Sequence, residues 1–142
     1  ARIRRYCQAA GQPVPESVGS LVRCILESLA LKYRYVLEQI VAVRGRPVKT
    51  IHIIGGGSQN SLLCQMTADA TGCTVVGGPA EASSIGNAIV QLVALGDLGS
   101  MAEGRQLVRD SFPLAVYQPA AQFDWDAAAV RFKRLLDNPA EL

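Results

Sequence analysis

The stretch "IHIIGGGSQNSLLCQM", residues 51–66, decides the fold, because branched apolar residues run into three glycines and then into a helical pattern. Short β-branched segments between turn residues are typical of buried strands in parallel sheets, so "VKTIHII" (residues 48–54) predicts a strand buried on both faces. The helix that follows is expected to run from Ser58 to Gly72. Its inward residues are expected to be Leu62, Leu63, Met66 and Ala70.

Downstream of this helix, "CTVVGG" (residues 73–78) predicts a second strand, and the two strands with their helix form a parallel strand, helix, strand unit. A further helix is expected between Pro79 and Gly96. Ser100 and Glu103 predict a capping box for the next helix, which ends before Pro113. "LAVYQP" (residues 114–119) is expected to be a brief extended piece. Asp124 is expected to cap a last helix that stops at Asn138 and Pro139.

Upstream of the first strand, the sequence predicts one long helix. Ser17 can cap its start, and Gly45 with Pro47 ends it. Its apolar residues recur at steps of three and four, which places them in one continuous stripe. The residues of this stripe are Val18, Val22, Ile25, Leu29, Tyr33, Val36, Ile40 and Val43.

Only two convincing strands accompany these helices, and a two-stranded parallel sheet is not stable alone. The chain also begins with Ala1, not Met, in a segment that is already helix-like. We therefore expect a piece of a larger protein that lacks strands on its N-terminal side. An open, apolar strand edge would remain, so we expect the piece to self-associate as a dimer or larger species.

The composition indicates one globular domain. The chain has 142 residues, of which 49% are hydrophobic and 18% charged, which argues against disorder. The net charge of +2 is dispersed, so nucleic-acid binding is not expected. The four cysteines show no CxxC spacing and His52 is the only histidine, so we expect no metal site and free thiols in a reducing cytoplasm. No signal peptide or membrane-length apolar run is recognised, so no membrane association is expected.

The glycine turn at Gly55–Asn60 lies where parallel sheets bind ligands, beyond the carboxyl end of a strand. Asn60 replaces the third glycine of a dinucleotide fingerprint, no lysine completes a P-loop, and a nucleophile elbow would also require glycine at position 60. The remaining interpretation is a turn whose backbone lies against a flat or phosphorylated group, such as adenosine, with Asn60 as a hydrogen-bonding residue. The alternatives are a tight turn without a ligand and a surface amide at Asn60.

Three blocks, "GGGSQN", "ADATG" and "GPAEASSIGN", occur in an order and spacing that resembles the C-terminal domain of the FGGY carbohydrate kinases. The resemblance extends from about the first residue to Leu114 and weakens over the last helix. It implies an α/β fold, a partial actin-like ATPase (ribonuclease H-like) domain that is helix-rich with a short parallel sheet. Residues 1–142 would be the C-terminal nucleotide-binding part, without the N-terminal sugar-binding domain and the start of this one.

The resemblance also implies residue roles. Gly56 would back the nucleotide, Asn60 would reach the adenosine or its nearest phosphate, and Gly86 would permit close packing behind the cleft. The residues implied in nucleotide binding are Gly55, Gly56, Gly57, Ser58, Gln59 and Asn60.

The implied reaction is transfer of the γ-phosphoryl group of ATP to the 1-hydroxyl of L-rhamnulose, or of a related ketose, with Mg²⁺. The sugar would bind through the missing domain. In the family, the phosphate loops and the catalytic aspartate lie upstream, so no catalytic residue or metal ligand is expected in this chain. Asp97–Gly99 has the residue types of a phosphate loop, but it follows a helix and no strand leads into it, so we expect only a helix stop. The chain alone is expected to bind ATP or ADP without turnover. The alternative is a self-standing, non-catalytic adenine-nucleotide-binding or interaction module.

Three other polar residues have structural interpretations. Asp69 lies in the last turn of its helix, where its charge opposes the helix dipole, so we expect a hydrogen-bonding partner and a structural latch more than catalysis. Glu81 begins the next helix, where its negative charge is favourable, so capping explains it; the alternative is a role beside the nucleotide. His52 is expected to be a buried or half-buried strand residue.

Overall fold

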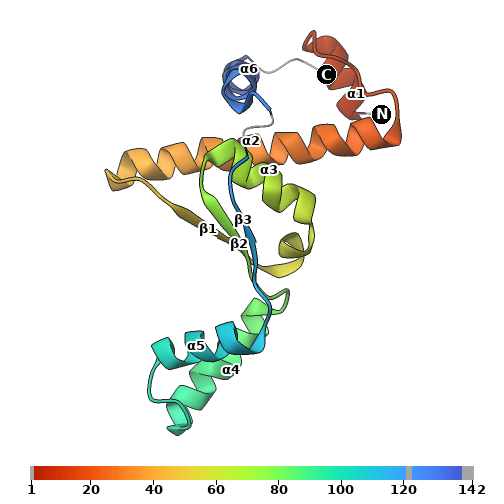
Figure 1. Cartoon of the computed structure of the whole chain (residues 1–142). Helices are drawn as coiled ribbons and strands as arrows, with labels where there is room; N and C mark the ends of the chain where they lie inside the picture. The colour runs from red at the N-terminus through yellow and green to blue at the C-terminus, as the bar shows by residue number, and fades with distance from the viewer. Residues whose placement is uncertain (1, 121–122, 139–142) are drawn as a thin grey trace.

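A computed structural model describes residues 2–120 and 123–138 (Figure 1). This part of the chain is rich in helix and contains one small sheet. In chain order the elements are α1 (Arg2–Ala9), α2 (Val18–Arg44), β1 (Thr50–Ile53), the 3₁₀ helix η1 (Gly55–Gln59), α3 (Ser61–Thr71), β2 (Thr74–Gly77), α4 (Ala82–Leu95), α5 (Met101–Ser111), β3 (Ala115–Tyr117) and α6 (Trp125–Asp137).

The long helix α2 begins and ends at the predicted residues. The Ser17 hydroxyl accepts the Ser20 backbone N–H at 3.0 Å, and the Ser20 hydroxyl in turn accepts the Ser17 N–H. This reciprocal pair satisfies two of the N–H groups that a helix start leaves free. At the other end, Gly45 takes the left-handed conformation with φ 68°. The capping residues therefore fixed both ends of the helix from local sequence alone.

The sheet has the strand order β1-β2-β3 and is mixed. β1 and β2 are parallel, with Ile51 opposite Val75, which confirms the predicted parallel pair. β3 runs antiparallel to β2, with Ala115 opposite Gly77. The expectation of a purely parallel sheet is therefore wrong, because the extended piece after α5 pairs with β2 as a third strand.

The two faces of the sheet differ in their cover. On one face, Cys64 and Ala68 of α3 pack with the fully buried Val75, joined by Ile51 and Tyr117. On the other face, His52 is exposed and Val116 is 58% exposed. The prediction that β1 is buried on both faces is therefore wrong within the described residues, and His52 is not buried. Helix α3 covers only one face of the sheet. The β-branched composition of the strand does not show whether one face or both faces are covered.

The main core lies between α2, α3 and α6. Its central residues include Ala30 of α2, Met66 of α3 and Trp125 of α6. The predicted apolar stripe of α2 points away from this core, and every residue in it is exposed, from 37% at Ile25 to 92% at Val43. We call these eight residues the outer stripe: Val18, Val22, Ile25, Leu29, Tyr33, Val36, Ile40 and Val43.

A polar network on the edge of this core ties three helices together. Arg34 of α2 forms an ion pair with Asp126 of α6 at 2.7 Å and donates to the carbonyl oxygen of Ala70 in α3 at 3.2 Å. Glu38 of α2 accepts from Arg34 at 3.3 Å and from Lys133 of α6 at 2.5 Å. The network fixes α6 across α2 and satisfies a carbonyl group in the last turn of α3.

Helices α4 and α5 pack on each other and project away from the sheet (Figure 1). They meet where Gly104 of α5 lies against Ile89 of α4, and a Cβ atom at position 104 would overlap Cγ2 of Ile89. Gly104 therefore sets how closely the two helices approach. None of the helices in residues 2–120 and 123–138 is both long and apolar enough to cross a membrane.

Candidate functional site

The glycine turn follows β1 at the end of the strand that points away from α2 (Figure 1). Five of the six residues that the sequence singles out form η1, and the sixth, Asn60, is the N-cap of α3. Helix α3 thus begins at Ser61, and the predicted start at Ser58 is wrong because the 3₁₀ turn occupies the residues between. Leu62 is 50% exposed, so its predicted inward position is also wrong.

The first glycine of the turn is required by the backbone. Gly55 has φ +75°, a conformation that residues with a Cβ rarely adopt. Its N–H donates to the carbonyl oxygen of Pro79 at 3.3 Å, and its own carbonyl oxygen accepts the Ser58 hydroxyl at 2.7 Å. These two bonds close the turn and join it to the chain that leaves β2. Gly55 and Ser58 therefore shape the turn, whatever else they contact.

The next two glycines are not required by the folded chain. A Cβ atom at Gly56 would meet no atom within 4 Å, and one at Gly57 would touch only Cγ2 of Ile53 at 3.6 Å, an ordinary contact. Neither residue has a positive φ. Gly56 is exposed, so its bare backbone faces open space. The described protein thus explains the glycine at position 55 but gives no internal reason for the glycine at position 56.

Two further glycines, which the sequence analysis did not assign to the site, support the turn from behind. A Cβ atom at Gly77 would lie 3.4 Å from the carbonyl oxygen of Ser58, and one at Gly78 would lie 3.1 Å from Cγ2 of Ile54. The Gly78 N–H also donates to the carbonyl oxygen of Ile53 at 2.8 Å. The sequence signal was present in the doubled glycine of "CTVVGG", but its meaning depends on the parallel pairing of β1 with β2.

Asn60 joins the turn to α3 through its side chain. Its Oδ1 accepts the Leu63 backbone N–H at 3.0 Å, so Asn60 caps the helix. The side chain is exposed, and its NH₂ group remains a donor for a molecule lying on the turn. Gln59 is exposed at the rim of the same turn. The six predicted residues are thus brought together on one surface, with a helix N-terminus directly behind them.

The remaining polar candidates are not part of this surface. Asp69 accepts the Ala120 backbone N–H at 2.8 Å and the Gln65 amide at 2.7 Å, which confirms the expected hydrogen-bonding partner. Glu81 occupies the N-cap position of α4, so its charge lies at the start of the helix as expected, but its side chain makes no capping hydrogen bond. A Cβ atom at Gly86 would meet nothing within 4 Å, so the close packing expected there is not found. Asp97 and Leu98 follow the end of α4 as a helix stop.

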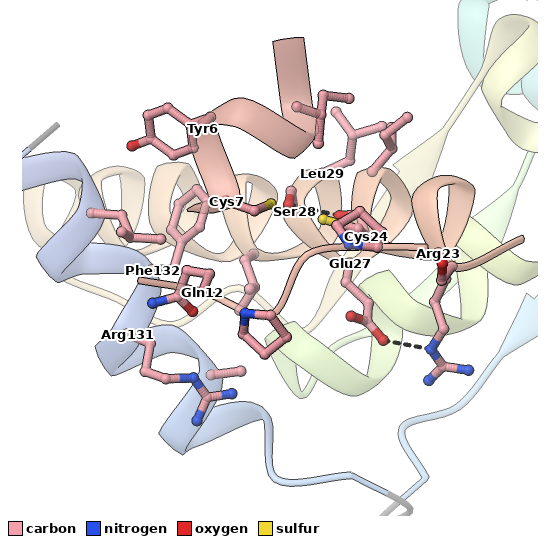
Figure 2. Close-up of a pocket in the computed structure, with 18 of the residues that line it drawn as sticks. Tyr6, Cys7, Gln12, Arg23, Cys24, Glu27, Ser28, Leu29, Arg131 and Phe132 are labelled. Atoms are coloured by element: carbon pink, nitrogen blue, oxygen red, sulfur yellow. Dashed lines mark hydrogen bonds and ion pairs between the residues drawn. The ribbon is translucent and has the colours of Figure 1, made fainter. Parts of the chain in front are cut away.

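A groove lies elsewhere, between α1, α2 and α6, with a volume of about 1200 Å³ (Figure 2). Cys7 and Cys24 lie next to each other in it, and burial together with the neighbouring Cys7 thiol raises the pKa of Cys24. A second groove of about 780 Å³ lies between α2, the end of α3 and the start of α6. Neither is lined by residues 55–60, and the first is mainly apolar. In the described part of the chain, no cluster of three or more His, Cys, Asp or Glu residues could hold a metal ion.

The model of the FGGY family of carbohydrate kinases, C-terminal domain, matches residues 1–95, which include the whole glycine turn. The chain belongs to the FGGY family of carbohydrate kinases. Similar relatives within this kinase family are a rhamnulokinase of Bacteroides thetaiotaomicron, 53% identical over 92% of this chain, and a rhamnulokinase of Klebsiella pneumoniae, 51% identical over 84%. A rhamnulokinase of Pectobacterium carotovorum is 45% identical over 94% of the chain.

These matches cover 27%, 24% and 27% of the respective relatives. The chain therefore spans about a quarter of the length of the FGGY kinases that it matches. About three quarters of each relative has no counterpart in it.

Proposed function

We propose that the chain is the C-terminal ATP-binding part of a rhamnulokinase-like sugar kinase and that residues 55–60 hold the adenosine end of the nucleotide. The carrying observation is the bare backbone at Gly56, for which the folded chain itself gives no reason. This turn lies inside the span matched by the family model and carries the Asn60 amide beside it. A flat purine or ribose can approach such a backbone more closely than any surface that bears side chains.

The proposed reaction is phosphoryl transfer from ATP to the 1-hydroxyl of L-rhamnulose. The hydroxyl oxygen attacks the γ-phosphorus, the bond from that phosphorus to the β,γ-bridging oxygen breaks, and ADP leaves with the bond's electron pair. The hydroxyl proton passes to an acidic base. We place this base, the sugar site and the ligands of Mg²⁺ in the part of the kinase outside residues 1–142, so the chain alone would bind ADP without turnover. The name rhamnulokinase of the relatives supports rhamnulose as the substrate.

We further propose a partial actin-like ATPase fold and a cytoplasmic location for this kinase. The parallel β1–β2 pair with α3 as its crossover supports the fold. The four free cysteines support a reducing compartment.

The direct test is calorimetric titration of the chain with ADP, with Gly56→Val as the probe and Gly19→Val as the matched control. A side chain has comparable room at both positions, because a Cβ at Gly19 would meet only the Ser17 hydroxyl at 3.8 Å. We expect wild-type binding, at least a tenfold loss of affinity in Gly56→Val and none in Gly19→Val. Equal affinity in all three proteins, or no ADP binding by the wild type, would refute the nucleotide assignment.

A chimera separates the kinase from the alternative of a non-catalytic nucleotide module. In it, this chain replaces the matching C-terminal quarter of the Bacteroides thetaiotaomicron rhamnulokinase. We expect the chimera to phosphorylate L-rhamnulose and to lose this activity with Gly56→Val. A folded chimera that binds ADP but does not phosphorylate rhamnulose would favour the module, and rhamnulose turnover by the chain alone would contradict the proposed division of labour.

A further inference from the structure

The side chain of Asn60 has a fixed orientation at the end of the glycine turn. Its Oδ1 accepts the Leu63 backbone N–H at 3.0 Å and therefore points at the start of α3. The NH₂ group lies on the other side of the planar amide and points away from the helix. No hydrogen bond between described residues uses this NH₂ group as a donor. Asn60 therefore presents a donor, not an acceptor, to a molecule on the turn.

The other side chains of the turn have no comparable fixed polar group. The Ser58 hydroxyl donates to the carbonyl oxygen of Gly55 at 2.7 Å, so its hydrogen is directed into the turn itself. Gly56 is exposed and bears no side chain. Gln59 is exposed, and its amide makes no hydrogen bond within the described chain, so it can present either its oxygen or its NH₂ group. The donor of Asn60 is thus the polar side-chain feature that the fold itself orients.

The charge around the turn favours a neutral group over a phosphate. Residues 50–104, which form β1, the turn, α3, β2 and α4, contain neither lysine nor arginine. Glu81 follows closely after Pro79, whose carbonyl oxygen accepts the Gly55 N–H at 3.3 Å. It is exposed, and its side chain does not cap α4. A phosphate lying here would have no cation from this stretch to pair with, and Glu81 would repel it.

A purine base offers neutral acceptors that match a fixed donor. Adenine and guanine share the ring acceptors N3 and N7. They differ at position 6, where adenine has an amine that donates and guanine has an oxygen that accepts. A donor can bind a ring nitrogen of either base, whereas selection of adenine would require an acceptor facing the amine. The orientation of Asn60 does not provide one.

We infer that Asn60 donates to a purine ring nitrogen, N7 or N3, and that this site takes purine nucleotides in general, guanosine nucleotides included. The base lies on the bare backbone at Gly56, and the phosphates contribute little to the affinity of this chain. The inference rests on the proposed nucleotide binding by residues 55–60 and names the class of nucleotide that they accept.

Asn60→Asp separates the helix cap from the contact with the base. Asp caps helices as well as Asn does, and its charge is favourable at a helix N-terminus, so Tm should fall by no more than about 2 °C. An ionised carboxylate cannot donate a hydrogen bond to a ring nitrogen. By calorimetric titration we expect ADP, GDP and adenosine all to bind at least about tenfold more weakly.

Ser17→Asp is the matched control. It also adds one negative charge at an N-cap whose side chain accepts a backbone N–H, here that of Ser20 at 3.0 Å, and it lies at the start of α2, outside the turn. Tm should again change by no more than about 2 °C, and the affinities for all three ligands should equal those of the wild type.

The ligand series identifies the atom that Asn60 contacts. At physiological ionic strength we expect the wild type to bind adenosine, ADP and GDP with affinities within about threefold of one another. In 7-deazaadenosine and 3-deazaadenosine a C–H group replaces one ring nitrogen. One of these analogues should bind the wild type at least about fivefold more weakly than adenosine, and this difference should vanish in Asn60→Asp.

Three results would overturn the inference. If ADP bound at least tenfold more tightly than adenosine and Asn60→Asp removed this difference, Asn60 would contact a phosphate. If ADP bound at least tenfold more tightly than GDP and Glu81→Gln removed that preference, the carboxylate of Glu81 would read the adenine amine. If all affinities were unchanged in Asn60→Asp, Asn60 would be a helix cap only.

Failure of this inference can be distinguished from failure of the nucleotide assignment. If Gly56→Val abolishes ADP binding but Asn60→Asp does not weaken it, residues 55–60 hold the nucleotide and only the role inferred for Asn60 is wrong. If the wild type binds none of the ligands, both proposals are refuted together.

Discussion

The Asp69 carboxylate accepts the backbone N–H of Ala120 at 2.8 Å, although the two residues are far apart in sequence. The bond fastens the chain after β3 to the last turn of α3, and Gln65 reinforces it by donating both to Asp69 and to the carbonyl oxygen of Gln118. A carboxylate at the C-terminal end of a helix interacts unfavourably with the helix dipole. The hydrogen bonds to Asp69 offset this unfavourable interaction.

We predict that Asp69→Ala lowers the free energy of unfolding by about 1–2 kcal/mol, because the Ala120 N–H and the Gln65 amide lose their acceptor. Asp69→Asn keeps an acceptor oxygen and should cost less. Urea denaturation measures both, and ADP affinity should be unchanged. If Asp69→Ala left stability intact but removed ADP binding, the latch interpretation would be wrong.

A methyl group at Gly104 should destabilise the α4–α5 pair, because it would overlap Cγ2 of Ile89. We expect Gly104→Ala to cost about 1–3 kcal/mol despite the higher helix propensity of Ala. Gly86→Ala in α4 is the control, since its methyl group meets open space, and it should stabilise by up to about 1 kcal/mol. In a double-mutant cycle, Ile89→Ala should suppress most of the cost of Gly104→Ala. Additive effects would show that the two residues do not set the helix spacing.

The stability of the α2–α6 contact should depend on acid. Burial alone would raise the pKa of Glu38, but hydrogen bonds and the positive charges of Lys133 and Arg34 outweigh it and hold the pKa below its ordinary value of 4.5. A carboxyl group with a lowered pKa contributes stability above its unfolded pKa and loses it as pH falls through the folded pKa. The contribution is at most about 1 kcal/mol because the side chain is 36% exposed.

We therefore expect unfolding free energy to fall more steeply below about pH 4.5 in wild type than in Glu38→Gln. Denaturant unfolding at a series of pH values measures the difference, which should be present at pH 6 and disappear toward pH 3. Parallel curves for the two proteins over this range would contradict the role assigned to Glu38.

The isolated chain should self-associate through the open edge of β1. His52→Pro removes an N–H group that points to that edge, and proline is tolerated on edge strands at such positions. Light scattering over a concentration series should show dimers or larger species for wild type and for the control His52→Ala, which keeps the backbone donor. The proline variant should remain monomeric. A wild type that stays monodisperse and monomeric at high concentration would count against this prediction.

The sequence predicted most reliably what short-range chemistry determines. Ser17 and Gly45 fixed α2 from end to end, and Gly72 and Gly96 ended α3 and α4 as expected. The position of the glycine turn was predicted from its three consecutive glycines. Hydrophobic periodicity shows which residues of α2 share a face. It does not show whether that face packs against another element or stays exposed. For this reason the burial predicted for one face of β1 was wrong, and the exposure of the outer stripe was not predicted.

Long-range pairing accounts for the remaining differences. β3 has three residues, too few for a recognisable pattern, and it becomes a strand only because β2 lies beside it. Gly77 and Gly78 acquire their role behind the glycine turn only through the β1–β2 pair. The sequence pattern places the start of α3 at Ser58, whereas Asn60 is its N-cap after a 3₁₀ turn.

Gly77 and Ala115 face each other across the β2–β3 ladder, so the chain leaves the sheet and returns to it at almost the same point. Residues 78–114, with α4 and α5, thus form a long connection between two antiparallel strands whose ends are already paired. Closing a loop costs little more when the loop is longer. A change in the length of α4 or α5 should therefore cost little stability in the strands β2 and β3 that anchor them.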